Sequence, residues 1–420
     1  MKKTNLLPSI LVTSLFFLWA LTSNLIPTLI PHLKKACRLT DFQSAFIDSA
    51  YWIAYFFIAI PAGLVMKKFG YKKAIIVGLI IAAVGTFLFY PAAEQRTFTF
   101  FLAALFIVAS GMTFLETAAN PYMTILGDPE TASQRLNFAQ AFNGLGAFIA
   151  AFFLSKVILS GKEISDATLA KLSLSEANVL LTLEAKSVQL PYVVIGIVLL
   201  LVAVVFMLTR FPAEQQKMEV DGHSAGAFNL FRHKHLLMGI VAQFFYVGAQ
   251  VCISSFFIRY CKYAAGLAEL EAASYLGLLL LGFMVGRYVG TFVMQYIQPA
   301  LLLALYSIVN IVLLSVIVFV GGKISIFALI GVEFFMSIMY PTIFSLAIKG
   351  LAENTKMASS YLVMAIVGGA IFPVIMGKVS DVTNIQIAYL VPAACFLVVL
   401  YFSVKVKSVN EPSKAILSAT

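Results

Sequence analysis

Apolar residues along the chain gather in long runs, and short polar segments separate these runs. About 20 consecutive apolar residues form a helix long enough to cross the hydrocarbon layer of a membrane. The runs lie at 7–31, 43–66, 72–92, 98–126, 138–160, 189–210, 235–259, 271–294, 299–320, 323–349, 357–380 and 385–405. The pattern therefore predicts an all-α membrane protein with twelve transmembrane helices.

The most polar stretch near the middle of the chain is 211–234, and it separates six predicted spans from the next six. We predict an N-terminal six-helix bundle at 1–210, a cytoplasmic linker at 211–234 and a C-terminal six-helix bundle at 235–420. Two similar bundles joined in this way are typical of transporters. The segment 161–188 predicts one or two short surface helices between spans five and six.

Composition supports the membrane assignment, because 61% of residues are hydrophobic and only 11% are charged. The net charge of +10 is explained by Lys and Arg in loops that stay in the cytoplasm, so we do not expect nucleic-acid binding. With twelve spans, most basic segments fall on one side, namely Lys2, Lys3, 66–73, Arg135, Arg232, Lys234, Lys405 and Lys407. This predicts a multi-pass membrane protein with both termini in the cytoplasm.

Motifs for enzymatic chemistry are missing from the sequence. There is no GxSxG elbow, no GxxxxGK[ST] loop and no HExxH motif, and none of the four cysteines forms a metal-spaced pair. We therefore expect no enzymatic activity, no metal and no cofactor other than a proton as coupling ion.

Three acidic residues fall inside predicted spans, namely Asp48, Glu116 and Glu333. A charged side chain at mid-bilayer costs roughly 2.5–3.5 kcal/mol on insertion scales, so such a residue must face protein or water, or take up a proton. We interpret Glu116 as a proton-coupling residue. For Asp48 and Glu333 a structural acid, hydrogen-bonded to a neighbouring helix, remains an alternative, and we assign Glu333 a gating or structural role.

Amide and aromatic side chains accompany Glu116 at helical spacing. Asn120 lies one turn beyond it, and the next span carries Gln140 and Asn143. Span seven contributes Gln250 and span ten contributes Tyr340. Amides offer both donors and acceptors, and aromatic rings stack on sugars, so these residues predict a binding site for a hydroxyl-rich solute. Hydrogen bonding between helices is the alternative.

Arg287 is a lone cation inside span eight, and we expect it to serve gating or structure rather than substrate contact. The prolines Pro61, Pro121, Pro341 and Pro373 also lie inside spans. Each predicts a kinked or broken helix whose freed carbonyl must find another donor.

Several motifs together resemble one family closely, namely FLETAANPYMTILG at 114–127, RLNFAQAFNGLGA at 135–147, AQFFYVGAQ at 242–250 and MSIMYPTIFSLAIKGL at 336–351. They are similar to the fucose:proton symporter family of the major facilitator superfamily, and the similarity runs nearly end to end. The resemblance implies proton-driven import of L-fucose or a related hexose by alternating access. It also implies that Glu116 handles the proton, and that Asn24, Gln140 and Asn143 contact the sugar.

Two departures from the family pattern affect coupling. Ile26 and Pro27 stand where the family has an Asn-Asp pair, and Asp48 is the candidate to compensate from span two. Lys67 stands where the wider superfamily prefers an aspartate. A proton-independent sugar facilitator, or an exporter, therefore remains an alternative, as does a non-transporting sensor. In each case we expect a small sugar and the lipid bilayer as partners, and a chain that functions as a monomer.

Overall fold

The computed structural model describes residues 6–25, 37, 41–150, 173–186, 188–211 and 233–410, and these residues are predominantly helical. Eleven of its helices are long and apolar enough to cross a membrane. The fifth predicted span, 138–160, runs past residue 150 and so lies partly outside the described ranges, as does most of the predicted linker at 211–234. The all-α architecture of a multi-pass membrane protein is confirmed.

The chain divides into two compact units. The first unit contains residues 1–119 and 142–214, and the second contains 120–141 and 215–420. Segment 120–141, the end of span four and the start of span five, thus clusters with the C-terminal helices although it precedes them by many residues in sequence.

Helices of the first unit follow the predicted spans closely. They are α1 (Leu6–Ser23), α3 (Asp41–Phe69), α4 (Tyr71–Gln95), α5 (Phe98–Ile125, as far as residue 119), α6 (Ala132–Ile149, from residue 142), α9 (Leu174–Lys186) and α10 (Gln189–Leu208). Helix α9 confirms a surface helix in the segment 161–188, of which 161–172 lies outside the described residues.

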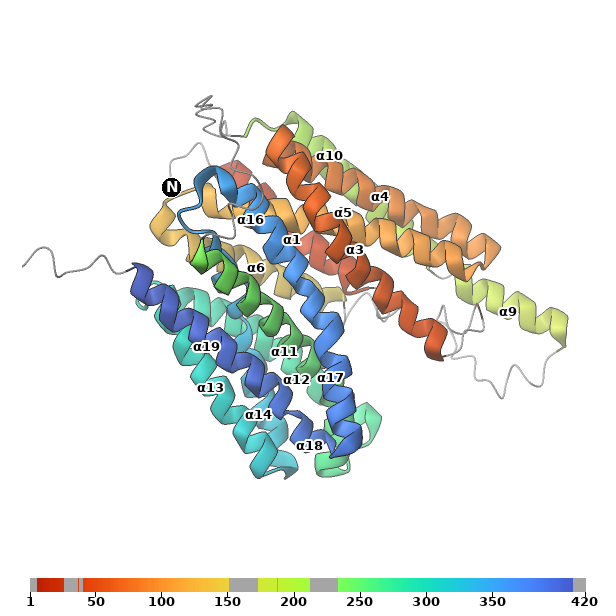
Figure 1. Ribbon diagram of the computed structural model, residues 1–420. Helices are drawn as coiled ribbons and strands as arrows, with labels where there is room; N and C mark the ends of the chain where they lie inside the picture. Colours follow the sequence, from red (N-terminus) through yellow and green to blue (C-terminus); the bar gives the residue numbers. More distant parts are fainter. Residues whose placement is uncertain are drawn as a thin grey trace, which may run out of the picture. The chain divides into compact units, whose positions relative to one another are not determined.

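Glycines allow helices of this unit to approach closely. A methyl group added at Gly111 of α5 would lie 2.6 Å from the Gly78 carbonyl oxygen of α4 and would also meet the backbone of Ala82. At Gly146 of α6, an added methyl would lie 2.5 Å from the Phe17 carbonyl oxygen of α1. Helix α10 runs beside α4 (Figure 1). Small residues therefore hold this bundle together through backbone proximity.

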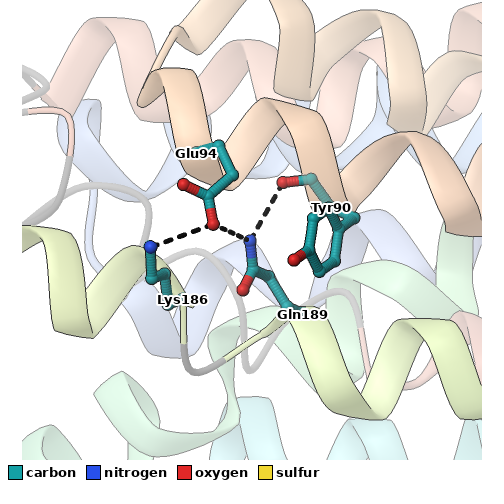
Figure 2. A network of polar contacts seen from close by, with 4 residues as sticks. All are labelled: Tyr90, Glu94, Lys186 and Gln189. Carbon is teal, nitrogen blue, oxygen red and sulfur yellow. Dashed lines mark hydrogen bonds and ion pairs between the residues drawn. The ribbon is translucent and has the colours of Figure 1, made fainter.

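A polar network joins the end of α4 to the start of α10 and to α9 (Figure 2). Lys186 at the end of α9 forms an ion pair of 2.9 Å with Glu94. The Gln189 amide donates to Glu94 at 3.2 Å and to the Tyr90 carbonyl at 3.1 Å. Because both ionic partners are partly exposed, this network positions the surface helix rather than contributing much stability.

The second unit contains 120–141, with η2 (Pro129–Thr131), and the C-terminal helices. These are α11 (Lys234–Ala265), α12 (Glu269–Val293), α13 (Pro299–Phe319), α14 (Gly322–Met336), α15 (Met339–Ile348), η5 (Ala352–Asn354), α16 (Thr355–Met364), η6 (Ala365–Val367), α17 (Gly368–Val382), α18 (Ile385–Ala388) and α19 (Leu390–Asn410). Helix α13 lies between α14 and α19 (Figure 1).

Two predicted spans are interrupted, and one of the interruptions lies beside Pro341, where a kinked or broken helix was expected. Span ten breaks between α14 and α15, and span eleven passes through the short 3-10 helix η6. Pro341 follows the first interruption closely, as expected for a ring that clashes with the preceding turn. By contrast, Pro61, Pro121 and Pro373 lie inside helices that are not broken at those residues.

We predict that Gly111→Ala destabilises the protein by about 1–3 kcal/mol, because the added methyl overpacks against α4. Gly377→Ala is the matched control, since its methyl would lie 3.6 Å from Phe256 in ordinary contact. Thermal unfolding of the purified variants in detergent measures both effects. Equal melting temperatures for the two variants would contradict close packing at Gly111.

Candidate functional site

The break in span ten leaves backbone groups that need partners. Pro341 has no N–H, so the carbonyl of Ser337, four residues earlier, lacks its normal helical donor. The Arg287 Nε–H of α12 donates to that carbonyl at 2.8 Å. Arg287 therefore completes the backbone hydrogen bonding at lipid depth, where an unsatisfied carbonyl would cost several kcal/mol, about as much as a lost buried hydrogen bond.

Tyr246 of α11 acts at the same break. Its hydroxyl donates to the Met336 carbonyl at 3.1 Å and accepts the backbone N–H of Tyr340. In an unbroken helix, that carbonyl and that N–H would bond each other. The tyrosine hydroxyl is thus inserted into the helical ladder, which explains why the helix stops at Met336 and resumes at Met339.

Arg287 also forms hydrogen bonds with α6. Its Nη1 donates to the Gln140 backbone carbonyl at 2.6 Å and to the Gln140 side-chain oxygen at 3.2 Å. The guanidinium lies 4.6 Å from the Phe283 ring centre, and the residue is only 3% exposed. A buried cation with these partners joins α12, α6 and the junction of α14 with α15.

Further polar contacts tie segment 120–141 into the second unit. The Gln140 amide donates to the Asn120 side-chain oxygen at 2.9 Å, and both residues are buried. Asn137 donates to the Thr342 hydroxyl at 3.1 Å. The hydroxyls of Ser133 and Ser345 lie 2.7 Å apart. A sugar that contacts Asn120 or Gln140 would therefore meet amides that already bond to each other.

Glu116 of α5 lies in the first unit and is 3% exposed. Tyr51 of α3 is near enough to interact with it electrostatically. The Tyr51 hydroxyl lies 3.0 Å from the hydroxyls of both Ser23 and Tyr55, and the Trp19 indole also bonds to it. Glu116 therefore lies within electrostatic range of a tyrosine hydroxyl that is itself bonded to hydroxyls of α1 and α3.

Glu333 of α14 lies in the second unit and is 2% exposed. Its carboxyl oxygen Oε1 accepts the Ser254 hydroxyl of α11 at 2.9 Å. Three of the predicted substrate-binding residues are less enclosed. Asn143 and Gln250 are half-buried, and Asn24 is exposed, with its amide donating to the Ala20 carbonyl at 2.8 Å.

Tyr340 is buried, and its ring stacks on Phe344 with centroids 6.3 Å apart. Asp48 lies on α3 at a position whose side chain is outside the described residues.

Sequence reasoning missed several hydroxyl partners. Tyr51 and Tyr55 are spaced by four on α3, which is a usable signal, but Ser23 and Ser254 are single hydroxyls that only the packing reveals. Tyr246 lies four residues before Gln250 on α11, but its position at a break in another helix follows only from the packing.

Buried acids, amides and a cation within a bundle of membrane-spanning helices define a multi-pass membrane protein of the carrier class. The family model of the Major Facilitator Superfamily matches residues 11–373, and the chain belongs to this superfamily.

Individual relatives are similar over nearly the whole chain. The L-fucose-proton symporter of Escherichia coli strain K12 is 43% identical, with 96% of this chain and 93% of that protein covered. The glucose/galactose transporter of Brucella abortus is 39% identical, with coverage of 93% and 92%. The crystal structure of a Major Facilitator Superfamily transporter, FucP, in the outward conformation has a TM-score of 0.91 and 42% identity, covering 96% of this chain and 99% of that one.

We predict that Arg287→Met lowers the free energy of unfolding by about 1–3 kcal/mol for each buried acceptor left without a donor. Pro341→Ala returns an N–H that can bond the Ser337 carbonyl, so the cost of Arg287→Met should be smaller in the Pro341→Ala background. A double-mutant cycle of melting temperatures and denaturant midpoints measures this coupling. Strict additivity of the two substitutions would show that Arg287 does not compensate for the proline.

Proposed function

We propose that this protein is a proton-coupled importer of a monosaccharide, L-fucose or a related hexose, that works by alternating access. The observation that carries the proposal is the buried Glu116 carboxyl at lipid depth beside Tyr51. Hydroxyl neighbours can donate to a carboxylate and accept from a carboxylic acid, so the same surroundings tolerate both protonation states. A group that changes charge as its access changes is what proton coupling requires.

The relatives support the choice of substrate. One is named an L-fucose-proton symporter and another a glucose/galactose transporter, so a neutral hexose is the shared chemistry. We keep the predicted substrate-binding set, Asn24, Asn120, Gln140, Asn143, Gln250 and Tyr340, because amides and an aromatic ring suit a hydroxyl-rich ring. Asp48 remains a proposed second coupling residue that compensates for Pro27.

Several further properties belong to this proposal. The basic loops support a bacterial inner membrane location with both termini in the cytoplasm. We propose that one chain is the transport unit, divided at the linker 211–234, with a proton as coupling ion and no cofactor. A glucose/galactose-type facilitator that needs no proton is the second candidate, favoured by Pro27 in place of the family aspartate.

The test uses purified protein in liposomes with an inward proton gradient and labelled L-fucose, D-galactose and D-glucose. Wild-type protein should accumulate one of these sugars against its gradient. Glu116→Gln should abolish that accumulation and retain sugar exchange at equal concentrations, because a permanently neutral side chain still binds sugar but moves no proton.

Glu94→Gln is the matched control, because Glu94 is partly exposed at the end of α4 and should leave accumulation unchanged. Accumulation by Glu116→Gln at the wild-type ratio would remove Glu116 from the coupling mechanism. Downhill uptake that ignores the proton gradient in the wild type would favour the facilitator.

A further inference from the structure

A second buried acid, Glu333, has a contact suited to proton exchange. The Ser254 hydroxyl on α11 lies 2.9 Å from Glu333 Oε1 and 3.1 Å from the Gln250 backbone carbonyl. A hydroxyl has one hydrogen and can donate it to only one of these two oxygens at a time. The protonation state of Glu333 therefore decides to which of these two oxygens the Ser254 hydroxyl donates.

Both protonation states fit these positions without movement of heavier atoms. When Glu333 is a carboxylate, Ser254 donates to it and the Gln250 carbonyl keeps only its helical N–H. When Glu333 is a carboxylic acid, its O–H donates to the Ser254 oxygen, and Ser254 donates to the Gln250 carbonyl. The change from one state to the other adds or removes one proton at the Glu333 carboxyl and rotates the Ser254 hydroxyl.

Several titratable groups on neighbouring helices lie near Glu333. Arg287 of α12 is within electrostatic range of its carboxyl, and so are the phenols of Tyr246 and Tyr389. The carboxyl residue itself is 2% exposed.

Helix α13 also packs on α14, and its only titratable residue is Tyr306, whose ring meets the Phe335 ring edge to face. Arg287 at the same time donates hydrogen bonds to the backbone carbonyls of Ser337 and Gln140. Arg287 therefore directs these hydrogen bonds to backbone carbonyls, whereas the Ser254 hydroxyl bonds to the Glu333 carboxyl.

We propose that Glu333 is a second proton-exchanging carboxyl of the transport cycle, and that Ser254 relays its state to Gln250. The inference rests on the proposed function, in which Glu116 carries a proton and Gln250 contacts the sugar. It goes beyond that function in assigning two protons to each sugar. In each transport cycle, Glu333 takes up the second proton from one side of the membrane and releases it to the other side.

The number of protons moved per sugar follows from the proton gradient at which net sugar flux stops. It is measured in liposomes whose membrane potential is clamped at zero. Against a tenfold sugar gradient, two protons per sugar balance at about half a pH unit and one proton at about one pH unit. Wild-type protein should balance near the first value and Glu333→Gln near the second. Glu271→Gln, an exposed acid on the same unit, should match the wild type.

An unchanged balance point in Glu333→Gln would overturn the inference and leave Glu333 as a structural acid. Wild-type flux that ignores the proton gradient would instead defeat the proposed function, so the two failures are distinguishable. If Glu333→Gln does not fold, infrared difference spectra on acidification decide the matter in Ser254→Ala. The carboxylic carbonyl band of Glu333 should shift in frequency when its hydroxyl partner is removed, and the absence of any band that shifts would overturn the inference.

Discussion

The rest of the structure depends on one constraint, which is that backbone carbonyls at lipid depth need donors. Pro341 removes one donor from span ten, and the helix stops at Met336. Two side chains from other helices restore the balance, since Arg287 donates to the Ser337 carbonyl and Tyr246 donates to the Met336 carbonyl. A charged guanidinium can be buried here because several carbonyl oxygens surround it. The broken span and the buried cation therefore explain each other.

This constraint also determines what the neighbouring polar residues can do. The Gln140 side chain accepts a hydrogen bond from Arg287 and donates one to Asn120. The two amides are therefore part of a connected network rather than isolated groups. Such a network is specific because removing any member leaves a buried partner unsatisfied. If the amides contact a sugar, its hydroxyls would join or replace these bonds, which couples substrate recognition to the contacts of segment 120–141.

Each of the two buried acids has a hydroxyl group in its surroundings, although the acids lie in different units. Glu116 is near the Tyr51 hydroxyl, and Glu333 accepts the Ser254 hydroxyl. Hydroxyls can reverse their donor and acceptor roles, which a fixed cation cannot do. An acid in such surroundings changes its protonation state at little structural cost. This chemistry suits a carrier that takes up and releases a proton in every cycle.

Much of the fold could be predicted from the chain because helix length in a membrane is set by hydrocarbon thickness. The spans, the surface helix at Leu174–Lys186 and the positions of the buried acids all follow from local apolar runs. Local patterns could not show that Tyr246 enters the break in span ten, that Arg287 reaches Gln140, or that Ser254 meets Glu333. These contacts join residues distant in sequence, so only the packing of helices decides them. The sequence by itself determined which segments cross the membrane and which polar groups enter it, whereas the tertiary structure decided which donors satisfy those groups.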